Sequence, residues 1–510
     1  EFGGNGHLER FAAAMAWLKE HPGEELVIPP GVYEVTESRA RAVYYDMISG
    51  RLGGNPQDVM FRPDFPYTRV LDLEGQEGTR LIAEGVTLLL DGFFEPVSLR
   101  HCKKVTVRGL TIDYKRKPYS RGLIERVSKD GELTVHFTAD MPDCFPCLRS
   151  AVSDPHTGVL RYSLFSLGKW RRLGGNTFSV ETDGASRAYV GTELYIWHSY
   201  HSRPAVCIQN AEDITLENVT IHAQPGMGVV GHLSRNIRIE GLSVIPSSGE
   251  RMSTNTDATH FSSCYGKLVL QNCVFDGQGD DAVNVQNYDH AFAPIGGSTY
   301  RLTCLAADGT HTQAPDLPAV GDEMQLIARG TLDKGEKFLV TAARANADGT
   351  CDVTLCRPLP AGAEEKVYLE NSSACPEFVF SHCRARSHFA RSVLIKTHRA
   401  LVEHCIFEHV DLTAVVVAAE ENWGEGTSSE HVEILSNVFI GCGTRGNVPC
   451  AVTVYTGSKE GTGKQHRKVV VRDNVVLCAK GQRAFAFANV REVIAENNTV
   501  IEGEAADRAV

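Results

Sequence analysis

An eight-residue pattern of apolar and polar positions recurs along the chain. In each copy the two kinds of residue alternate until a polar or small residue, often Asn or Gly, interrupts them ahead of another apolar position. Alternation with a period of two is typical of a β-strand, and Asn and Gly are typical of tight turns. Each copy therefore predicts a strand, a corner and a second strand. The copies are VTVRGLTI from Val105, ITLENVTI from Ile214, IRIEGLSV from Ile237, LVLQNCVF from Leu268, FVFSHCRA from Phe378, ALVEHCIF from Ala400, VEILSNVF from Val432, VVVRDNVV from Val469 and VIAENNTV from Val493.

The spacing of the copies predicts an all-β solenoid. Three neighbouring pairs of copies start 23, 22 and 24 residues apart. A period this short, without helical segments, is typical of one coil of a right-handed parallel β-helix. The amphipathic stretch LERFAAAMAWLKEH, ahead of VIPPGVYEV, predicts an N-terminal helical cap over the first coil, with Trp17 packed against that coil.

Two gaps between copies are much longer, at 109 residues before Ile214 and 110 before Phe378. Subtracting one coil of about 23 residues leaves about 86 residues in each gap. Both gaps contain alternating runs such as NTFSVET and EKFLVTA, broken by Gly, Asp and Pro. We therefore expect two inserted antiparallel β-barrel or sandwich modules that wall a groove. The predicted segments are the cap and first coils at 1–116, a first module at 117–203, catalytic coils at 204–288, a second module at 289–374 and C-terminal coils at 375–510.

The repeat also predicts which residues stack. Residues one coil apart in a parallel β-helix lie at strand spacing, ~4.8 Å. Aligning GMGVVG, TDATHF, DDAVNV, ARSVLI and LTAVVV places Asp257 and Asp281 one coil apart, with Asp280 adjacent. Because successive side chains of a strand point to opposite faces, Asp280 and Asp281 reach one site only if a bulge or turn at Gly279-Asp280 breaks the alternation, and Gly277 and Gly279 permit one. We expect the three carboxylates to converge on an exposed groove.

A cluster of three carboxylates has two ordinary interpretations, calcium binding and a solvated turn. Calcium takes six or more oxygen ligands, and no loop rich in Asp and Asn accompanies these three. Like charges this close cannot all be cheaply ionised, which favours acid–base chemistry. We expect neither a metal nor a cofactor.

The stretches MSTNTDATHFSSC, which begins at Met252, and GQGDDAVNV, which begins at Gly277, resemble the inverting α-1,3-galactosidases of glycoside hydrolase family 110. These bacterial β-helix enzymes remove terminal galactose from glycans of the blood-group-B type, and two inserted β modules match their plan. The resemblance implies that Asp280 is the general acid and that Asp257 and Asp281 hold and deprotonate water. An inverting enzyme needs roughly 6.5–9.5 Å between acid and base to admit that water.

A more distant similarity is to polygalacturonases, through Asn255-Thr256-Asp257 and the Asp280-Asp281 pair. The GHG motif of that family is absent, with NYDHAF in its place. A β-helix polysaccharide lyase or epimerase acting on uronate polymers, a polygalacturonase-like hydrolase and a non-catalytic glycan-binding solenoid are the alternatives.

Five further residues are candidates for contact with substrate. His260 and Asn284 share one outward position on neighbouring coils, where they either hydrogen-bond sugar hydroxyls or serve as surface polar groups. Arg391 and Lys396 either contact substrate or form salt bridges with the carboxylates. Trp423, in the polar loop EENWGEG, offers a platform for the apolar face of galactose.

Charge and cysteine usage narrow the partners. The 510 residues carry a net charge of −12, and no apolar run reaches the ~18 residues of a membrane span, so we expect neither a nucleic-acid partner nor a transmembrane segment. Of the fifteen cysteines, Cys273, Cys383 and Cys405 share one repeat position and predict packed free thiols, whereas the CFPC pair Cys144 and Cys147 lacks a redox or zinc context. We expect a periplasmic or extracellular location with a signal peptide removed, and a homodimer suits the family resemblance.

Overall fold

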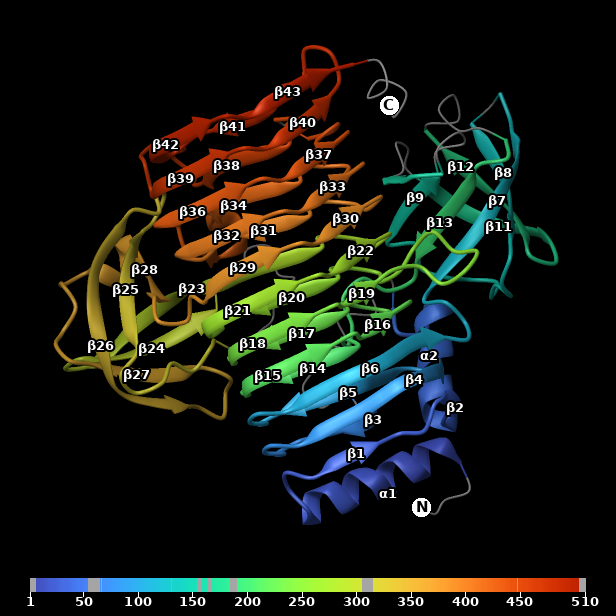
Figure 1. The fold of residues 1–510 in the computed structure, drawn as a ribbon, viewed down its shortest axis with the longest axis horizontal. Helices are drawn as coiled ribbons and strands as arrows, with labels where there is room; N and C mark the ends of the chain where they lie inside the picture. The colour runs from blue at the N-terminus through green and yellow to red at the C-terminus, as the bar shows by residue number, and fades with distance from the viewer. Residues whose placement is uncertain are drawn as a thin grey trace.

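The structure is a computed structural model that describes residues 6–53, 65, 67–129, 131–153, 158–162, 167–183, 190–304, 315–446 and 448–503. Three stacks of parallel strands build a β-helix from the N-terminus to the C-terminus (Figure 1). The first stack contains β4 (Arg80–Asp91), β6 (Thr106–Tyr114), β15 (Glu212–Glu217), β18 (Arg235–Glu240), β21 (Tyr265–Gln271), β29 (Glu377–Ser381), β32 (Arg399–Glu403), β36 (His431–Leu435), β39 (His466–Arg472) and β42 (Val490–Glu496).

The other two stacks complete each coil. The second, which continues from the far end of β6, contains β16 (Thr220–Ile221), β19 (Ser243–Val244), β22 (Val274–Asp276), β30 (Arg384–Arg386), β33 (Ile406–Glu408), β37 (Val438–Ile440), β40 (Val475–Cys478) and β43 (Thr499–Glu502). The third contains β3 (Thr68–Asp72), β5 (Phe94–Arg100), β14 (Val206–Gln209), β17 (Val229–His232), β20 (Thr259–Ser262), β23 (Val283–Gly296), β31 (Val393–Ile395), β34 (Val415–Glu420), β38 (Val452–Gly457) and β41 (Phe485–Phe487). The predicted parallel β-helix is confirmed.

The corner residue of every repeat lies between the first and second halves of its copy, and its backbone is left-handed. This position has φ of +52° at Asn218, +55° at Asn272, +55° at His382 and +54° at Asn497, and +68° at Gly241. Gly, Asn and Asp reach this conformation at the lowest cost, which explains why they recur there.

From Cys273 to Asn474, the residue after each corner is buried, and these residues form a ladder of hydrogen bonds from coil to coil. The backbone N–H of Cys273 donates to Cys383 Sγ, and that of Cys383 donates to Cys405 Sγ, both at 3.4 Å. The N–H of Cys405 donates to Asn437 Oδ1 at 2.9 Å, and that of Asn437 donates to Asn474 Oδ1 at 2.9 Å. The predicted free thiols are confirmed, and every cysteine whose side chain the structure describes is unpaired.

The N-terminal cap closes the first coils. Helix α1 (His7–Glu20) packs Phe11, Met15 and Leu18 into the main core, with Trp17 partly buried against it. Strands β1 (Glu25–Val27) and β2 (Gly31–Thr36) pair with β4. A second helix, α2 (Ser38–Ile48), was not predicted. In the described part of the chain, no helix has the length and apolar character to cross a membrane.

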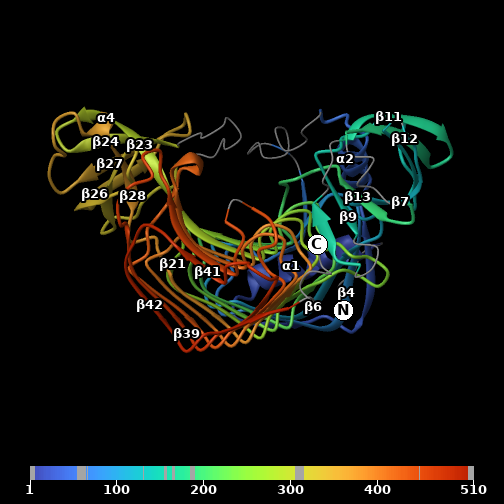
Figure 2. The ribbon, with the colours of Figure 1, turned by 90° about the horizontal axis from the view of Figure 1, so that it is seen from above.

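Two antiparallel modules stand on opposite sides of the solenoid (Figure 2). The first module is an open seven-stranded sheet of β7 (Tyr119–Val127), β8 (Glu132–Phe137), β9 (Arg149–Ser153), β10 (Leu160–Tyr162), β11 (Leu167–Gly174), β12 (Thr177–Thr182) and β13 (Glu193–Trp197). The second module is a closed six-stranded barrel of β23 with β24 (Thr299–Cys304), β25 (Glu323–Ala328), β26 (Lys334–Ala345), β27 (Cys351–Leu355) and β28 (Val367–Asn371), and the short helix α4 (Ala363–Lys366) precedes β28.

Strand β23 joins the solenoid to the second module without a linker. Its first residues pair in parallel with β20 and β31, and its later residues pair antiparallel with β24 and β28. The predicted boundary between 288 and 289 therefore falls inside one continuous strand.

Candidate active site

The three aspartates lie where two successive coils stack. His260 of β20 pairs with Asn284 of β23, so Asp257 and Asp281 occupy equivalent positions one coil apart. The backbone N–H of Ala258 donates to the carbonyl oxygen of Asp281 at 2.9 Å, which continues this register outside the strands. One oxygen from each of Asp257, Asp280 and Asp281 lies within 4.8 Å of the other two. The predicted stacking places all three carboxylates in one cluster.

The aspartate pair precedes the strand rather than opening it. Strand β23 begins at Val283, and both Ala282 and Val283 point into the core. The alternation therefore breaks between these two residues, and the backbone also bends at Gly279 and Asp280, where a bulge or turn was predicted. Gly277 has φ of +69°, and a Cβ on Gly279 would lie 2.1 Å from the carbonyl oxygen of Asn255. Both glycines are required for the approach of this segment to the preceding coil.

Burial of the cluster is greater than the sequence predicted. The side chains of Asp257, Asp280 and Asp281 are 7%, 16% and 2% exposed. The expectation of an exposed groove is wrong at this point, because His260 of the Asp257 coil, Arg391 of the next coil and Arg149 of the first module cover the carboxylates.

Asp281 forms an ion pair with Arg391 of the next coil. Arg391 Nε donates to Asp281 Oδ1 and Arg391 Nη2 donates to Oδ2, both at 2.8 Å. The backbone N–H of Arg391 also donates to Oδ1 at 2.8 Å. A bidentate guanidinium–carboxylate pair with an additional amide donor fixes the orientation of the carboxylate. Of the two interpretations of Arg391, the salt bridge is present.

Asp257 is paired with His260 at 2.8 Å through His260 Nδ1. Burial raises the pKa of Asp257, and Asp281 raises it further, whereas the bond from His260 lowers it. Burial lowers the pKa of His260, but Asp257 and Glu425 outweigh that effect and raise it. With the Gln286 amide oriented so that its nitrogen donates to Glu425 at 3.1 Å, its oxygen accepts from His260 Nε2 at 3.1 Å. Both ring nitrogens of His260 are then donors, as in a cationic imidazolium.

Asp280 is the member of the cluster that contacts the first module. Arg149 Nη1 of β9 lies 3.2 Å from Asp280 Oδ2, and its guanidinium stacks 3.7 Å from the ring centre of Tyr200. Burial and the neighbouring Asp281 raise the pKa of Asp280 to about 6, against the opposing effect of Arg149. A carboxyl with this pKa can carry a proton near neutral pH.

Lys396 belongs to a buried ion-pair network that reaches the aspartate cluster through Glu420 and Arg391. Its Nζ lies 2.5 Å from both Glu420 Oε2 and Glu425 Oε2, and its side chain is fully buried. Burial opposes ionisation of Glu420, but Lys396 and then Arg391 lower its pKa to about 2. The structure therefore favours the salt-bridge interpretation of Lys396 over substrate contact.

Asn284 and Trp423 differ in their surroundings. Asn284 is only 6% exposed, and among the described residues its Oδ1 has no hydrogen-bond partner. An unpaired oxygen beside His260 is available to a hydroxyl donor.

Trp423 ends the short helix η2 (Glu421–Trp423) and is 44% exposed. The next residues form β35 (Glu425–Gly426), which pairs with β23, so the loop that carries Trp423 lies against the third stack.

Four contacts of this site were not predicted. Glu420 and Glu425 lie in the EENWGEG loop on either side of Trp423, and Gln286 directly follows the DDAVNV motif. All three are therefore adjacent in sequence to residues that the sequence analysis had already identified. Arg149 had no such signal, because 131 positions separate it from Asp280 and only the fold of the first module brings them together.

The charges around the cluster disfavour a metal ion there. Arg149, Arg391 and His260 contact the three carboxylates directly. Calcium would need about six oxygen ligands, and the surrounding cationic groups repel any divalent ion.

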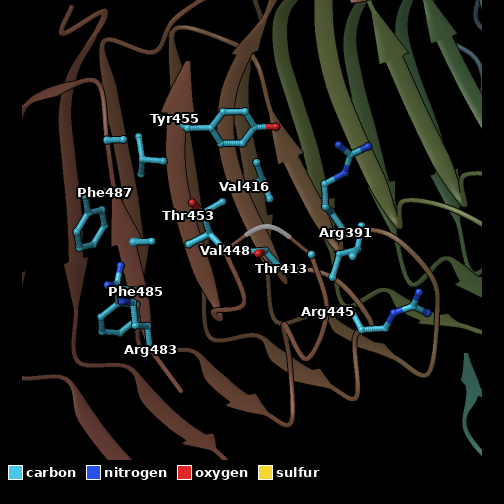
Figure 3. Close-up of a pocket in the computed structure, with 15 residues that line it drawn as sticks. Arg391, Thr413, Val416, Arg445, Val448, Thr453, Tyr455, Arg483, Phe485 and Phe487 are labelled. Atoms are coloured by element: carbon cyan, nitrogen blue, oxygen red, sulfur yellow. The ribbon is translucent and has the colours of Figure 1, made fainter. Parts of the chain in front are cut away.

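A cavity of about 780 Å³ adjoins the cluster and shares Arg391 with it. Strands β34, β38 and β41 line it with Val416, Thr453, Phe485 and Phe487 (Figure 3). The cavity lies on the C-terminal side of the cluster, so a molecule that reached Asp281 along the third stack would also meet apolar and aromatic surface.

Comparison with known proteins gives consistent relatives. The chain is 24% identical over 538 residues to α-1,3-galactosidase A of Bacteroides fragilis, and the alignment covers 97% of this chain and 86% of that protein. It is 26% identical over 521 residues to α-1,3-galactosidase B of Phocaeicola vulgatus, and this alignment covers 88% of this chain and 83% of that protein. This chain is a homologue of the α-1,3-galactosidases. No family model matches it.

Solved structures with a similar arrangement are distant in sequence. The A-module of a mannuronan C-5 epimerase of Azotobacter vinelandii is 10% identical, with a TM-score of 0.39 over 98% of this chain and 97% of that one. An exopolygalacturonase of Thermotoga maritima is 13% identical, with a TM-score of 0.35 over 95% of this chain and 87% of that one.

Proposed function

We propose that the protein is an exo-acting glycoside hydrolase that releases terminal α-1,3-linked galactose from glycans. The observation that carries the proposal is the cluster of Asp257, Asp280 and Asp281, in which one carboxyl can hold a proton while its two neighbours are fixed by cationic partners. The names of the homologues supply the substrate class.

In the proposed reaction Asp280 donates its proton to the glycosidic oxygen as the bond from that oxygen to galactose C1 breaks. A water held by Asp257 and Asp281 attacks C1 and gives up a proton to one of them. Arg391 and His260 keep those two carboxylates in place. The products are free galactose and the alcohol of the leaving group, and the proton taken from water later returns to Asp280 through solvent.

The stereochemical outcome is part of the proposal. The nearest oxygens of the three carboxylates are within 4.8 Å, which is shorter than the roughly 6.5–9.5 Å expected between the acid and base of an inverting enzyme. The expected separation is therefore not met by the nearest oxygens. Inversion is supported by the family resemblance and by Asp257 and Asp281, a pair of anchored carboxylates able to hold water.

The arrangement of the modules supports exo action. The two modules stand on opposite sides of the coils that carry the cluster, and a walled site suits a terminal sugar better than the middle of a long polymer. Branched blood-group-B-type glycans and linear α-1,3-galactosides both fit this proposal. A periplasmic or extracellular location, where such glycans are met, and a homodimer belong to the same proposal.

Release of free galactose from a panel of α-linked galactosides tests this function. We expect monosaccharide from α-1,3-linked substrates, and at least about a hundredfold lower rates for Asp257→Asn, Asp280→Asn and Asp281→Asn. Because the folded state raises the pKa of Asp280, its ionisation destabilises the protein as pH rises through about 6, so Asp280→Asn should be at least as stable as wild type at pH 7. Oligosaccharide products, or a near-normal rate in one variant, would contradict the proposed action or remove that residue from the mechanism.

A further inference from the structure

A second cluster of ligand-type side chains lies where the second module returns to the solenoid. Glu370 belongs to β28 of the barrel, Cys375 follows that strand, and His398 precedes β32 of the solenoid. One ligand atom from each of these three residues lies within 4.8 Å of the other two. No residue of this cluster contacts the three aspartates in any described interaction, so the two clusters are separate.

Two buried carboxylates lie together at this cluster, and one of them lacks a hydrogen-bond partner among the described residues. Glu370 is fully buried, which raises its pKa, whereas Thr427 and Asn287 lie against its carboxylate and act to lower that pKa. Asp289 is 1% exposed, and among the described residues neither of its carboxylate oxygens has a hydrogen-bond partner. The two residues face each other in the β23–β28 ladder. A Cβ added to Gly426 would lie 2.8 Å from an oxygen of each, which shows how closely the backbone of the β35 loop covers them. Leaving a buried carboxylate such as Asp289 unpaired costs several kcal/mol.

The remaining members of the cluster are suited to a metal. His398 Nε2 is also buried without a hydrogen-bond partner among the described residues. Cys375 Sγ accepts from Asn287 Nδ2 at 3.3 Å, and Asn287 also accepts from Thr427, so polar side chains hold the thiol in place. Cys375 and His398 are both partly exposed as residues, whereas the Nε2 atom of His398 is itself buried.

We propose that Glu370, Cys375 and His398 bind a divalent ion of the zinc class, with the carboxylate of Asp289 beside Glu370. Sulfur, imidazole and carboxylate together are typical zinc ligands, at ~2.0–2.3 Å from the metal. Ligand atoms already within 4.8 Å of one another need only small side-chain rotations to reach that shell. Lys334, whose Nζ donates to the carbonyl oxygen of Ser428 at 2.6 Å, adds one positive charge nearby. With the thiolate and two carboxylates ionised, a divalent cation and Lys334 neutralise the group.

The site would fasten the barrel to the solenoid. Its ligands come from β28, from the segment that follows the barrel and from the turn before β32, so one ion would join three parts of the chain. Binding to the folded state alone stabilises it. This role does not depend on the proposed galactosidase activity.

Cobalt substitution tests the proposal directly. The untagged full chain is stripped with a chelator under reducing conditions and titrated with Zn²⁺ or Co²⁺. We expect one ion per chain, a thiolate-to-cobalt charge-transfer band and a higher melting temperature with zinc. Cys375→Ser should remove the band, and His398→Gln should weaken binding by at least about tenfold.

Two controls separate this site from others. A Cys144→Ser, Cys147→Ser double variant tests the CFPC cysteine pair, and Asp280→Asn tests the aspartate cluster; both variants should keep the band. Absence of the band and of any zinc-dependent stabilisation in the wild-type chain would overturn the proposal and indicate that Asp289 and Glu370 share a proton instead. A band that persists in Cys375→Ser would also overturn it. Because the wild-type titration decides the outcome, the proposal stays testable even if a variant does not fold.

Discussion

At the scale of single residues, the environment of Asp280 decides what the aspartate cluster can do. Burial and Asp281 favour its protonated form, and Arg149 from the first module opposes them. Asp257 and Asp281 each have a cationic partner from their own coil or the next one. The register of the repeat was enough to predict that the three carboxylates meet. The partner that tunes Asp280 could not be predicted, because its position depends on how an inserted module folds.

This environment predicts a specific pH dependence. If Asp280 must carry a proton to act as the acid, kcat/KM should fall as pH rises through about 6, the pKa of this carboxyl in the free protein. Arg149→Met removes a charge that lowers this pKa, so the alkaline limb should move upward by about half a pH unit or more. The measurement is a pH profile of kcat/KM for the two proteins.

Arg171→Met is the matched control for this shift. Arg171 also belongs to the first module but pairs with Glu132 on its surface. Its profile should match the wild type. An unchanged or downward-shifted limb in Arg149→Met would show that Asp280 is not the titrating acid.

At the scale of the elements, the corner of each repeat connects sequence to structure most clearly. The recurrent Asn and Gly predicted a turn, and the structure gives the reason, a left-handed residue at every corner. The residue after the corner is Cys or Asn in several coils, and the apolar pattern alone does not explain this choice. Cys in some coils and Asn in others accept a backbone N–H from the preceding coil, so the two residue types are interchangeable there.

The ladder predicts which substitutions a coil tolerates. Asn437 is buried, accepts from the N–H of Cys405 at 2.9 Å and donates to the carbonyl oxygen of Val402 at 3.0 Å. Asn437→Leu leaves both groups unpaired and should lower the free energy of unfolding by about 1–3 kcal/mol. Asn437→Cys should cost less, because a thiol already accepts this bond in two other coils. Denaturant unfolding of both variants measures the difference, and equal losses would mean that the ladder bonds do not matter.

At the scale of the whole molecule, the period of the repeat predicted the solenoid and the two insertions. The fold of each inserted module could not be predicted from the apolar–polar pattern, because alternating strands are compatible with either a closed barrel or an open sheet. The second module closes into a barrel and the first remains open. Strand β23 also passes from one unit into the other, so no turn or linker residue marks that boundary.

Removing the barrel tests whether the modules shape the proposed site. Asp289 pairs with Glu370 and His290 with Leu369, so Ala291 and Tyr368 face each other and a two-residue Asn-Gly turn can join them in place of residues 292–367. We expect the solenoid to keep its β-sheet circular dichroism and its galactose affinity to fall by at least about tenfold. A folded deletion variant with full affinity would contradict the walled-site proposal.

The central claim is hydrolysis of a terminal α-galactoside by the three-aspartate cluster, and a proton NMR time course of the reaction tests it most directly. The anomeric signals report both the release of galactose and its first-formed configuration, before mutarotation mixes the two. We expect β-galactose to appear first with wild-type protein and no galactose with Asp280→Asn over the same interval. First-formed α-galactose would contradict the inverting mechanism, and undiminished release by Asp280→Asn would contradict the assignment of the site.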